Sequence, residues 1–368
     1  MTADPGPQAV LEEARRQVEI CNACRYCEGY CAVFPAITRR TEFADGDLTQ
    51  LANLCHNCRG CYYACQYTPP HEFALNLPRV LAELRQESWT RYAWPAGLAE
   101  RFQNSGLAIA LALAAALALG FWAVAALPGG GEGFYAALGH GAMLAIFTPT
   151  FLFPLVALGI GLSRFWRETG GHPVTLADLR EAAAAATSLG NLSGGQGQGC
   201  NYEREERYSD ARRWAHQATM YGFLLCFAAT SAGTVLHYLF AWPAPYPWWA
   251  PPKLFGVPGG VLLVLGTAGL AWLKTRADRE LGAPRAWGGE MAFVLMLGLT
   301  GLSGLALYAA TGTGAVAALL AIHLGAVFTL FLLTPYSKMA HGAYRFAALV
   351  RDAQGKTRRQ PLGEERRE

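Results

Sequence analysis

The sequence predicts a mostly α-helical fold in which a cysteine-rich helical domain at the N-terminus precedes a bundle of six transmembrane helices. Two observations predict this fold. Eight of the ten cysteines lie between residues 21 and 65, whereas from residue 107 onward the chain consists of long uncharged runs. The 368 residues are 52% apolar and only 15% charged, which is unusual for a soluble domain.

Residues 1–103 are predicted to form the cysteine-rich domain and a juxtamembrane helix. The opening MTADPGPQAVLEEARRQVEI lacks the apolar core of a secretory signal, so this domain is expected in the cytoplasm. Because thiols stay reduced there, metal ligands or free thiols are expected rather than disulfides. The stretch VLAELRQESWTRYAWPAGLAERFQ is predicted to be an interfacial helix with its Trp and Tyr side chains at headgroup depth.

Residues 104–345 are predicted to hold the six spans, because each apolar run approaches the ~20 residues that a helix needs to cross the hydrocarbon core. Pro154 lies inside the second span and is expected to kink it without ending it. The predicted spans are 107–127, 134–162, 216–242, 254–273, 291–308 and 315–335.

The distribution of basic residues predicts the orientation. The connections at 128–133 and 309–314 carry no Lys or Arg, whereas the 163–215 loop and the tail at 346–368 are arginine-rich. Both termini are therefore predicted to be cytoplasmic, in a multi-pass protein of a bacterial inner membrane. Within the long loop, TLADLREAAAAATSLG predicts a short helix opened by Thr175 or Asp178, followed by the glycine-rich GNLSGGQGQGCNY.

Two cysteine blocks, CNACRYCEGYC and CHNCRGCYYAC, share the spacing Cys-x2-Cys-x2-Cys-x3-Cys. In two-cluster ferredoxins the fourth cysteine of such a run ligates the other cluster, so the repeat predicts two interlocked [4Fe-4S] clusters. Zinc is the alternative, but structural zinc sites show separated Cys-x2-Cys pairs. The predicted ligands are Cys21, Cys24, Cys27 and Cys65 for one cluster and Cys55, Cys58, Cys61 and Cys31 for the other.

The usual ferredoxin proline after the fourth cysteine is replaced by Ala32 and Gln66, which favours the helical dicluster modules of flavoprotein-linked reductases. Two cysteines lie outside the blocks. Cys226, in a span, is expected to pack as a small hydrophobic residue. For Cys200, in GQGCNY, packing is favoured over a redox role.

Four of the eight histidines fall near the ends of two predicted spans: His216 and His237 in the third, His323 and His341 in and after the sixth. Ionisable residues inside spans suggest function. Since the two spans run in opposite directions, His216 is expected to face His341 at the cytoplasmic end and His237 to face His323 at the outer end. Each pair is predicted to hold a haem b through neutral imidazoles.

Other histidine roles stay open. The four residues could instead be hydrogen-bonded packing histidines, and His140 competes with His237 for the outer site. His56, His71 and His172 are expected to be hydrogen-bonding loop residues.

Several segments resemble known families. PYSKMAH, with His323 eighteen residues before His341, resembles the last transmembrane helix of the nitrate reductase gamma-type cytochrome b subunits, whose two histidines there ligate two haems b. Over nearly the whole chain, YYACQYTPPHEFALNLPR, GCNY, RRWAHQATMYGFLLCFAATSAGTVLHYLF, APYPWW and FLLTPYSKMAHGAYRFAAL resemble the tricarballylate utilisation protein B family.

This resemblance implies iron–sulfur clusters and haem, and electron transfer from the reduced flavin of tricarballylate dehydrogenase to the membrane quinone pool. A similar module is fused to a flavoprotein in aerobic cobalamin synthesis, which gives an alternative partner. The expected partners are thus a cytoplasmic flavoprotein dehydrogenase, quinone and the lipid bilayer.

Substrate catalysis is expected on the partner flavoprotein, because the sequence has no Rossmann glycine fingerprint after a strand and no triad or carboxylate pair. The net charge of +3 is too small to indicate a nucleic-acid partner. The alternatives from other classes are a membrane-anchored zinc sensor or assembly protein, and an enzyme that uses Cys200 or His71.

Overall fold

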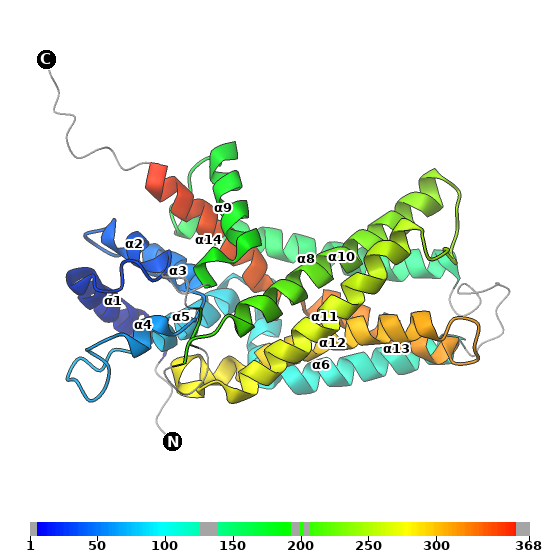
Figure 1. Cartoon of the computed structure of the whole chain (residues 1–368), viewed down its shortest axis with the longest axis horizontal. Helices are drawn as coiled ribbons and strands as arrows, with labels where there is room; N and C mark the ends of the chain where they lie inside the picture. Colours follow the sequence, from blue (N-terminus) through cyan, green and yellow to red (C-terminus); the bar gives the residue numbers. More distant parts are fainter. Residues whose placement is uncertain (1–5, 126–138, 193–198, 202–206, 358–368) are drawn as a thin grey trace, which may run out of the picture.

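The structure, a computed structural model, describes residues 6–125, 139–192, 199–201 and 207–357. In these residues all regular structure is helical, apart from one isolated bridge between Cys200 and Ser209. Short helices gather at one end of the molecule and long helices extend away from them (Figure 1). The predicted mostly α-helical fold is confirmed.

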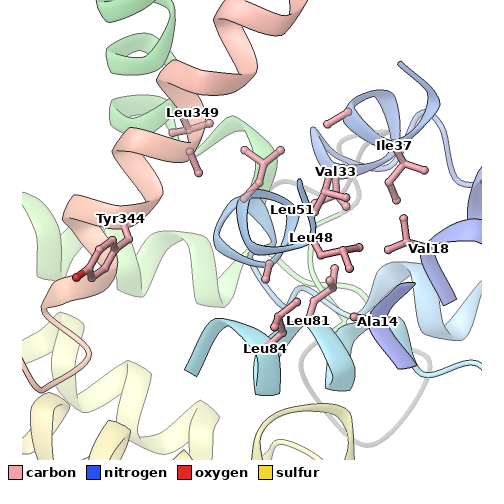
Figure 2. Close-up of a cluster of buried hydrophobic side chains, with 14 of the residues drawn as sticks. Ala14, Val18, Val33, Ile37, Leu48, Leu51, Leu81, Leu84, Tyr344 and Leu349 are labelled. Carbon is pink, nitrogen blue, oxygen red and sulfur yellow. The ribbon is translucent and has the colours of Figure 1, made fainter. Parts of the chain in front are cut away.

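Five helices form the N-terminal part: α1 (Pro7–Cys24), α2 (Val33–Thr38), α3 (Asp45–Leu54), α4 (Gly60–Tyr63) and α5 (Leu77–Tyr92). Their apolar faces meet in one core, which includes Val18, Ile37, Leu51 and Leu81. Tyr344, far along the sequence, belongs to the same core and lies at its edge (Figure 2). The N-terminal part is therefore packed against the C-terminal helix.

Within the described residues, six helices are long and apolar enough to cross a membrane. They confirm the predicted number of spans, although several begin or end some residues away from the predicted limits. The six are α6 (Ala96–Ala125), α8 (His140–Glu168), α10 (Ala211–Leu239), α11 (Pro251–Arg276), α12 (Trp287–Ala309) and α13 (Val316–Leu333).

The predicted interfacial helix is divided in the structure between α5 and the first turns of α6, and α6 is kinked at Ser105. As expected, α8 continues through Pro154. The predicted boundaries at 103/104 and 345/346 fall inside α6 and α14 (Ala340–Thr357), so the division into domains stays a prediction.

The sixth span does not continue to His341 as one helix. α13 ends at Leu333, and a turn separates it from α14. Thr334 keeps helical backbone angles, but Pro335 after it has no N–H to donate to the carbonyl of Phe331, so the helical hydrogen-bond ladder is interrupted there. His323 and His341 therefore lie on different helices, α13 and α14.

The loop between the second and third spans contains α9 (Leu176–Ser188), where the sequence predicts a helix. Thr175 and Asp178 form a capping box, in which each side chain accepts a hydrogen bond from the other's backbone N–H. α9 packs on α14. Most of GGQGQG lies outside the described residues.

Candidate metal and cofactor centre

The cysteines of each block lie where the chain leaves one helix and turns toward the next. Cys21 and Cys24 occupy the last turn of α1, and Cys55 caps the end of α3. Between the cysteines, Arg25, Asn57 and Arg59 have positive φ angles of 57°, 51° and 67°. Such left-handed backbone is unfavourable for a residue like Arg and is typical of functional loops. These backbone angles let each loop curve around the space between its cysteines.

Side-chain neighbours divide the eight thiols into two sets, and each set takes three cysteines from one block and the fourth from the other. Burial, followed by the negative charges of Cys27, Cys65 and Cys24, raises the pKa of Cys21 to about 12. The first set is Cys21, Cys24, Cys27 and Cys65.

The second set is Cys31, Cys55, Cys58 and Cys61. Burial, followed by Cys58 and Cys55, raises the pKa of Cys31 well above its ordinary value. The pKa of Cys61 is raised by burial and then by Cys58, Cys55, Cys31 and Cys27, so the two sets approach each other through Cys27 and Cys61. The crossing is the one that the spacing predicts for two interlocked clusters.

All four thiols of the second set line one cavity, whose other walls include the apolar Val33, Phe34, Leu77 and Leu81. We call it the thiol cavity. Four convergent thiols on apolar walls are a donor set suited to a [4Fe-4S] cluster. Within the described residues no three or more His, Cys, Asp or Glu side chains have the geometry of a single-ion site.

Cys200 belongs to this environment although it lies outside both blocks. It is 1% exposed, packs with Leu189 and Leu192, and has its Sγ 2.8 Å from the Leu192 carbonyl oxygen. Its S–H also reaches the sulfur of Cys58, lowers the pKa of that thiol, and has its own pKa raised in return. The next backbone N–H, of Asn201, donates to the Cys58 carbonyl at 3.0 Å.

His216, near the start of α10, and His341, near the start of α14, lie face to edge with ring centroids 5.9 Å apart and ring planes at 88°. Two imidazoles that share one metal hold their centroids roughly 6 Å apart, since each metal–nitrogen bond is about 2.0–2.1 Å. The separation of the two rings is therefore compatible with both imidazoles holding one haem iron.

The hydrogen bonds of this pair also fit ligation. His341 Nδ1 donates to the Lys338 carbonyl, which leaves Nε2 as the lone-pair nitrogen. Burial, with Arg345 nearby, holds the pKa of His341 well below its ordinary value, so the ring is neutral. His216 Nδ1 is buried and has no hydrogen-bond partner.

A second cavity, which we call the basic cavity, lies beside His216 and His341. Its acidic side chains are Asp278 and Glu290, and Glu290 bonds both Lys274 and Lys338 at 2.5 Å. The sequence motifs predict no cavity of this kind. Its basic side chains are Arg59, Arg85, Arg212, Lys274, Arg279, Lys338 and Arg345.

His56, Asn57 and Arg59 line both the thiol cavity and the basic cavity. His56 is 8% exposed, and burial lowers its pKa well below the ordinary value. Its carbonyl and that of Asn57 accept hydrogen bonds from Arg212 at 2.9 and 2.7 Å. One short segment thus separates the two candidate cofactor sites, a placement that the expected loop role of His56 did not include.

The contacts described for the outer histidines are with other residues. His323 Nδ1 lies 3.0 Å from Ser303 Oγ, whereas His237 lies edge-on to Tyr238 with centroids 4.9 Å apart. The side chain of His140 lies outside the described part of the chain. The outer haem site therefore stays a prediction.

Other singled-out residues have local contacts. His71 lies edge-on to Tyr67 and Phe73, with centroids 4.9 Å away in each case, and its Nδ1 accepts the Phe73 N–H at 3.1 Å. The His172 N–H donates to Gln354 at 3.3 Å. Cys226 packs against the cluster around Leu263.

Six membrane-length helices joined to a helical domain with two crossed sets of cysteines define a class, the multi-pass membrane iron–sulfur proteins. Residues 99–362 match the family described as Citrate utilization protein B, and residues 14–91 match its Fer4-like domain, which indicates iron–sulfur cluster binding. The chain belongs to the citrate utilization protein B family.

A relative of known name supports this membership. The chain is 43% identical over 357 residues to the Citrate utilization protein B of Escherichia coli, and the match covers 95% of this chain and 94% of that protein. No solved structure matches.

Proposed function

We propose that this chain reoxidises the reduced flavin of a partner dehydrogenase and delivers the electrons to membrane quinone by way of two [4Fe-4S] clusters and two haems b. The ligands would be the two cysteine sets, the His216–His341 pair and the His237–His323 pair. When bound, these groups supply one-electron chemistry, which this chain's side chains cannot supply. The protein would lie in a bacterial inner membrane with both termini in the cytoplasm.

The observation that carries this proposal is the wall shared by the thiol cavity and the basic cavity. His56, Asn57 and Arg59 border both cavities, so a group in each would be separated by one layer of side chains. Arg212, one turn before His216 on α10, holds this wall by its bonds to the His56 and Asn57 carbonyls. α10 is thereby fixed to the cysteine loop.

The first cysteine set offers the place where a partner can deliver electrons. Cys24 is exposed, and the neighbouring Tyr26 is 68% exposed. A flavoprotein that docks here would approach the first set without moving the core. The family's name favours a dehydrogenase of tricarballylate or citrate utilisation, and the flavoprotein of cobalamin synthesis is the alternative.

Optical spectroscopy of the purified protein tests the proposal. Dithionite should produce haem b bands and bleach a broad iron–sulfur shoulder, and metal analysis should find iron rather than zinc. His341→Ala should remove half of the haem, whereas His71→Ala, in a loop distant in sequence from the pair, should retain all of it. Protein that carries zinc and no haem bands, although made with adequate iron and haem, would sink the proposal.

A further inference from the structure

We propose that the basic cavity binds the two propionate carboxylates of the haem ligated by His216 and His341. This inference rests on the proposed function and adds the group that the cavity recognises. The chemistry recognised is a pair of carboxylates in a site of buried positive charge.

The basic cavity has an excess of positive charge, which favours binding of an anion. Seven basic side chains line it against two acidic ones. One of the two acids, Glu290, is already shared between Lys274 and Lys338. Lys274 and Arg85 are only 8% and 6% exposed. Lys274 is paired with Glu290, and Arg85 donates to the Ala52 and Cys55 carbonyls, but the cavity still has more cations than carboxylates. A ligand with two negative charges would offset this excess of buried positive charge.

An unused donor gives independent evidence. The indole Nε1 of Trp287, a residue of the cavity wall, is buried and has no hydrogen-bond partner. An indole can only donate, so this nitrogen requires an acceptor. The Lys274 ammonium and the Arg279 guanidinium lie 5.6 and 4.2 Å from the centre of the same ring. Two cations and one N–H donor therefore gather at one place on the wall.

The position of the cavity identifies the source of the carboxylates. His216 and His341 line the same cavity, so a macrocycle between them would have its edge beside these donors. A guanidinium binds a carboxylate with two parallel hydrogen bonds, which suits Arg279 at the exposed side of the cavity. A free polycarboxylate has the same chemistry and must be distinguished by experiment.

The test uses the holoprotein prepared with haem whose propionate carboxylates carry ¹³C. Redox-difference infrared spectra should show isotope-sensitive carboxylate bands that shift in Arg279→Gln and in Lys274→Gln. The matched control is Arg180→Gln, an exposed arginine on α9, which should leave the bands unchanged. Loss of a nearby cation should also lower the midpoint potential of one haem and not the other.

Arg279 is exposed, so its variant is expected to fold even if the Lys274 variant does not. Labelled bands that stay in place in a folded Arg279→Gln protein would overturn the inference, as would saturable binding of free citrate to the haem-loaded protein in equilibrium dialysis. Wild-type protein without haem would instead defeat the proposed function, so the two failures are distinguishable.

Discussion

The first three cysteines of each block have the same spacing, but the two cysteine sets that they begin have different surroundings. In the first set Cys24 is exposed and Tyr26 projects into solvent. In the second set the thiols enclose a cavity, and Arg85 and Arg345 both donate to the carbonyl of Cys55, at 2.7 and 2.6 Å. An identical motif has therefore been placed once at the surface and once among buried cations.

This difference suggests a direction for electrons. Cluster potentials depend on solvent exposure, net charge and hydrogen bonds to sulfur. Arginine charge and the Cys200 S–H would stabilise the reduced form of a cluster in the second set. We expect electrons to enter at the first set and to collect at the second, which borders the basic cavity.

Substitution of the fourth cysteine of a block is expected to have the largest effect, the loss of a whole cluster. If ligation is crossed, Cys65→Ser should lose the first-set cluster although Cys65 belongs to the second block. Its remaining electron paramagnetic resonance signal should match that of Cys21→Ser and differ from that of Cys58→Ser. Cys226→Ser should retain both signals. A Cys65→Ser spectrum that matches Cys58→Ser would show that each block ligates its own cluster.

The second-largest expected effect is a difference between the rates at which an oxidant destroys the two clusters. Because Cys24 is exposed, whereas all four cysteines of the second set are half-buried around the thiol cavity, ferricyanide should destroy the first-set cluster several-fold faster. The two signals, followed with time in the wild-type protein, give the two rates. Equal rates in intact protein would contradict the difference in burial.

How much of this contrast the sequence could predict depends on the range of the interactions. The cysteine sets follow from spacing inside two short loops, and the facing of His216 and His341 follows from the parity of the spans. The break before His341 also had a local signal in Pro335.

The basic cavity had no such signal, because its residues run from His56 to Arg345 and meet only when α5, α10, α11, α12 and α14 are packed. The position of Arg345 is the one local feature of the sequence that relates to this cavity. Arg345 follows His341 by four residues, so the two share a face of α14. The contact of Cys200 with Cys58 was likewise beyond prediction, since it depends on how the α9–α10 connection returns to the cysteine loop.

Arg345→Gln should have an intermediate effect. Arg345 donates to the carbonyls of Asn53 and Cys55 at the end of α3, and the loss of such buried bonds costs about 1–3 kcal/mol. The midpoint potential of the second-set cluster should fall, and this cluster should be lost at a lower temperature in a thermal scan of its absorbance. Lys356→Gln, an exposed change on the same helix, should alter neither quantity appreciably, because its pair with Glu181 is a surface pair worth about 0–1 kcal/mol and Asp352, its other partner, keeps its bond to Arg39. Equal behaviour of the two variants would argue against a role for Arg345 beside the cluster.

The smallest expected effect is that of Cys200. A hydrogen bond of about 0.5–1.5 kcal/mol to the Cys58 sulfur corresponds to roughly 20–65 mV in a one-electron potential. Cys200→Ala removes the donor and should lower the potential of the second-set cluster by this amount, whereas Cys200→Ser keeps an O–H donor and should shift it less. The first-set cluster serves as the internal control, because Cys200 contacts Cys58 and packs with Leu189 and Leu192. If the alanine and serine variants shift the potential equally, Cys200 acts through packing alone. If both variants lose the second-set cluster, Cys200 is a ligand of the cluster and not a hydrogen-bond donor to the ligand Cys58.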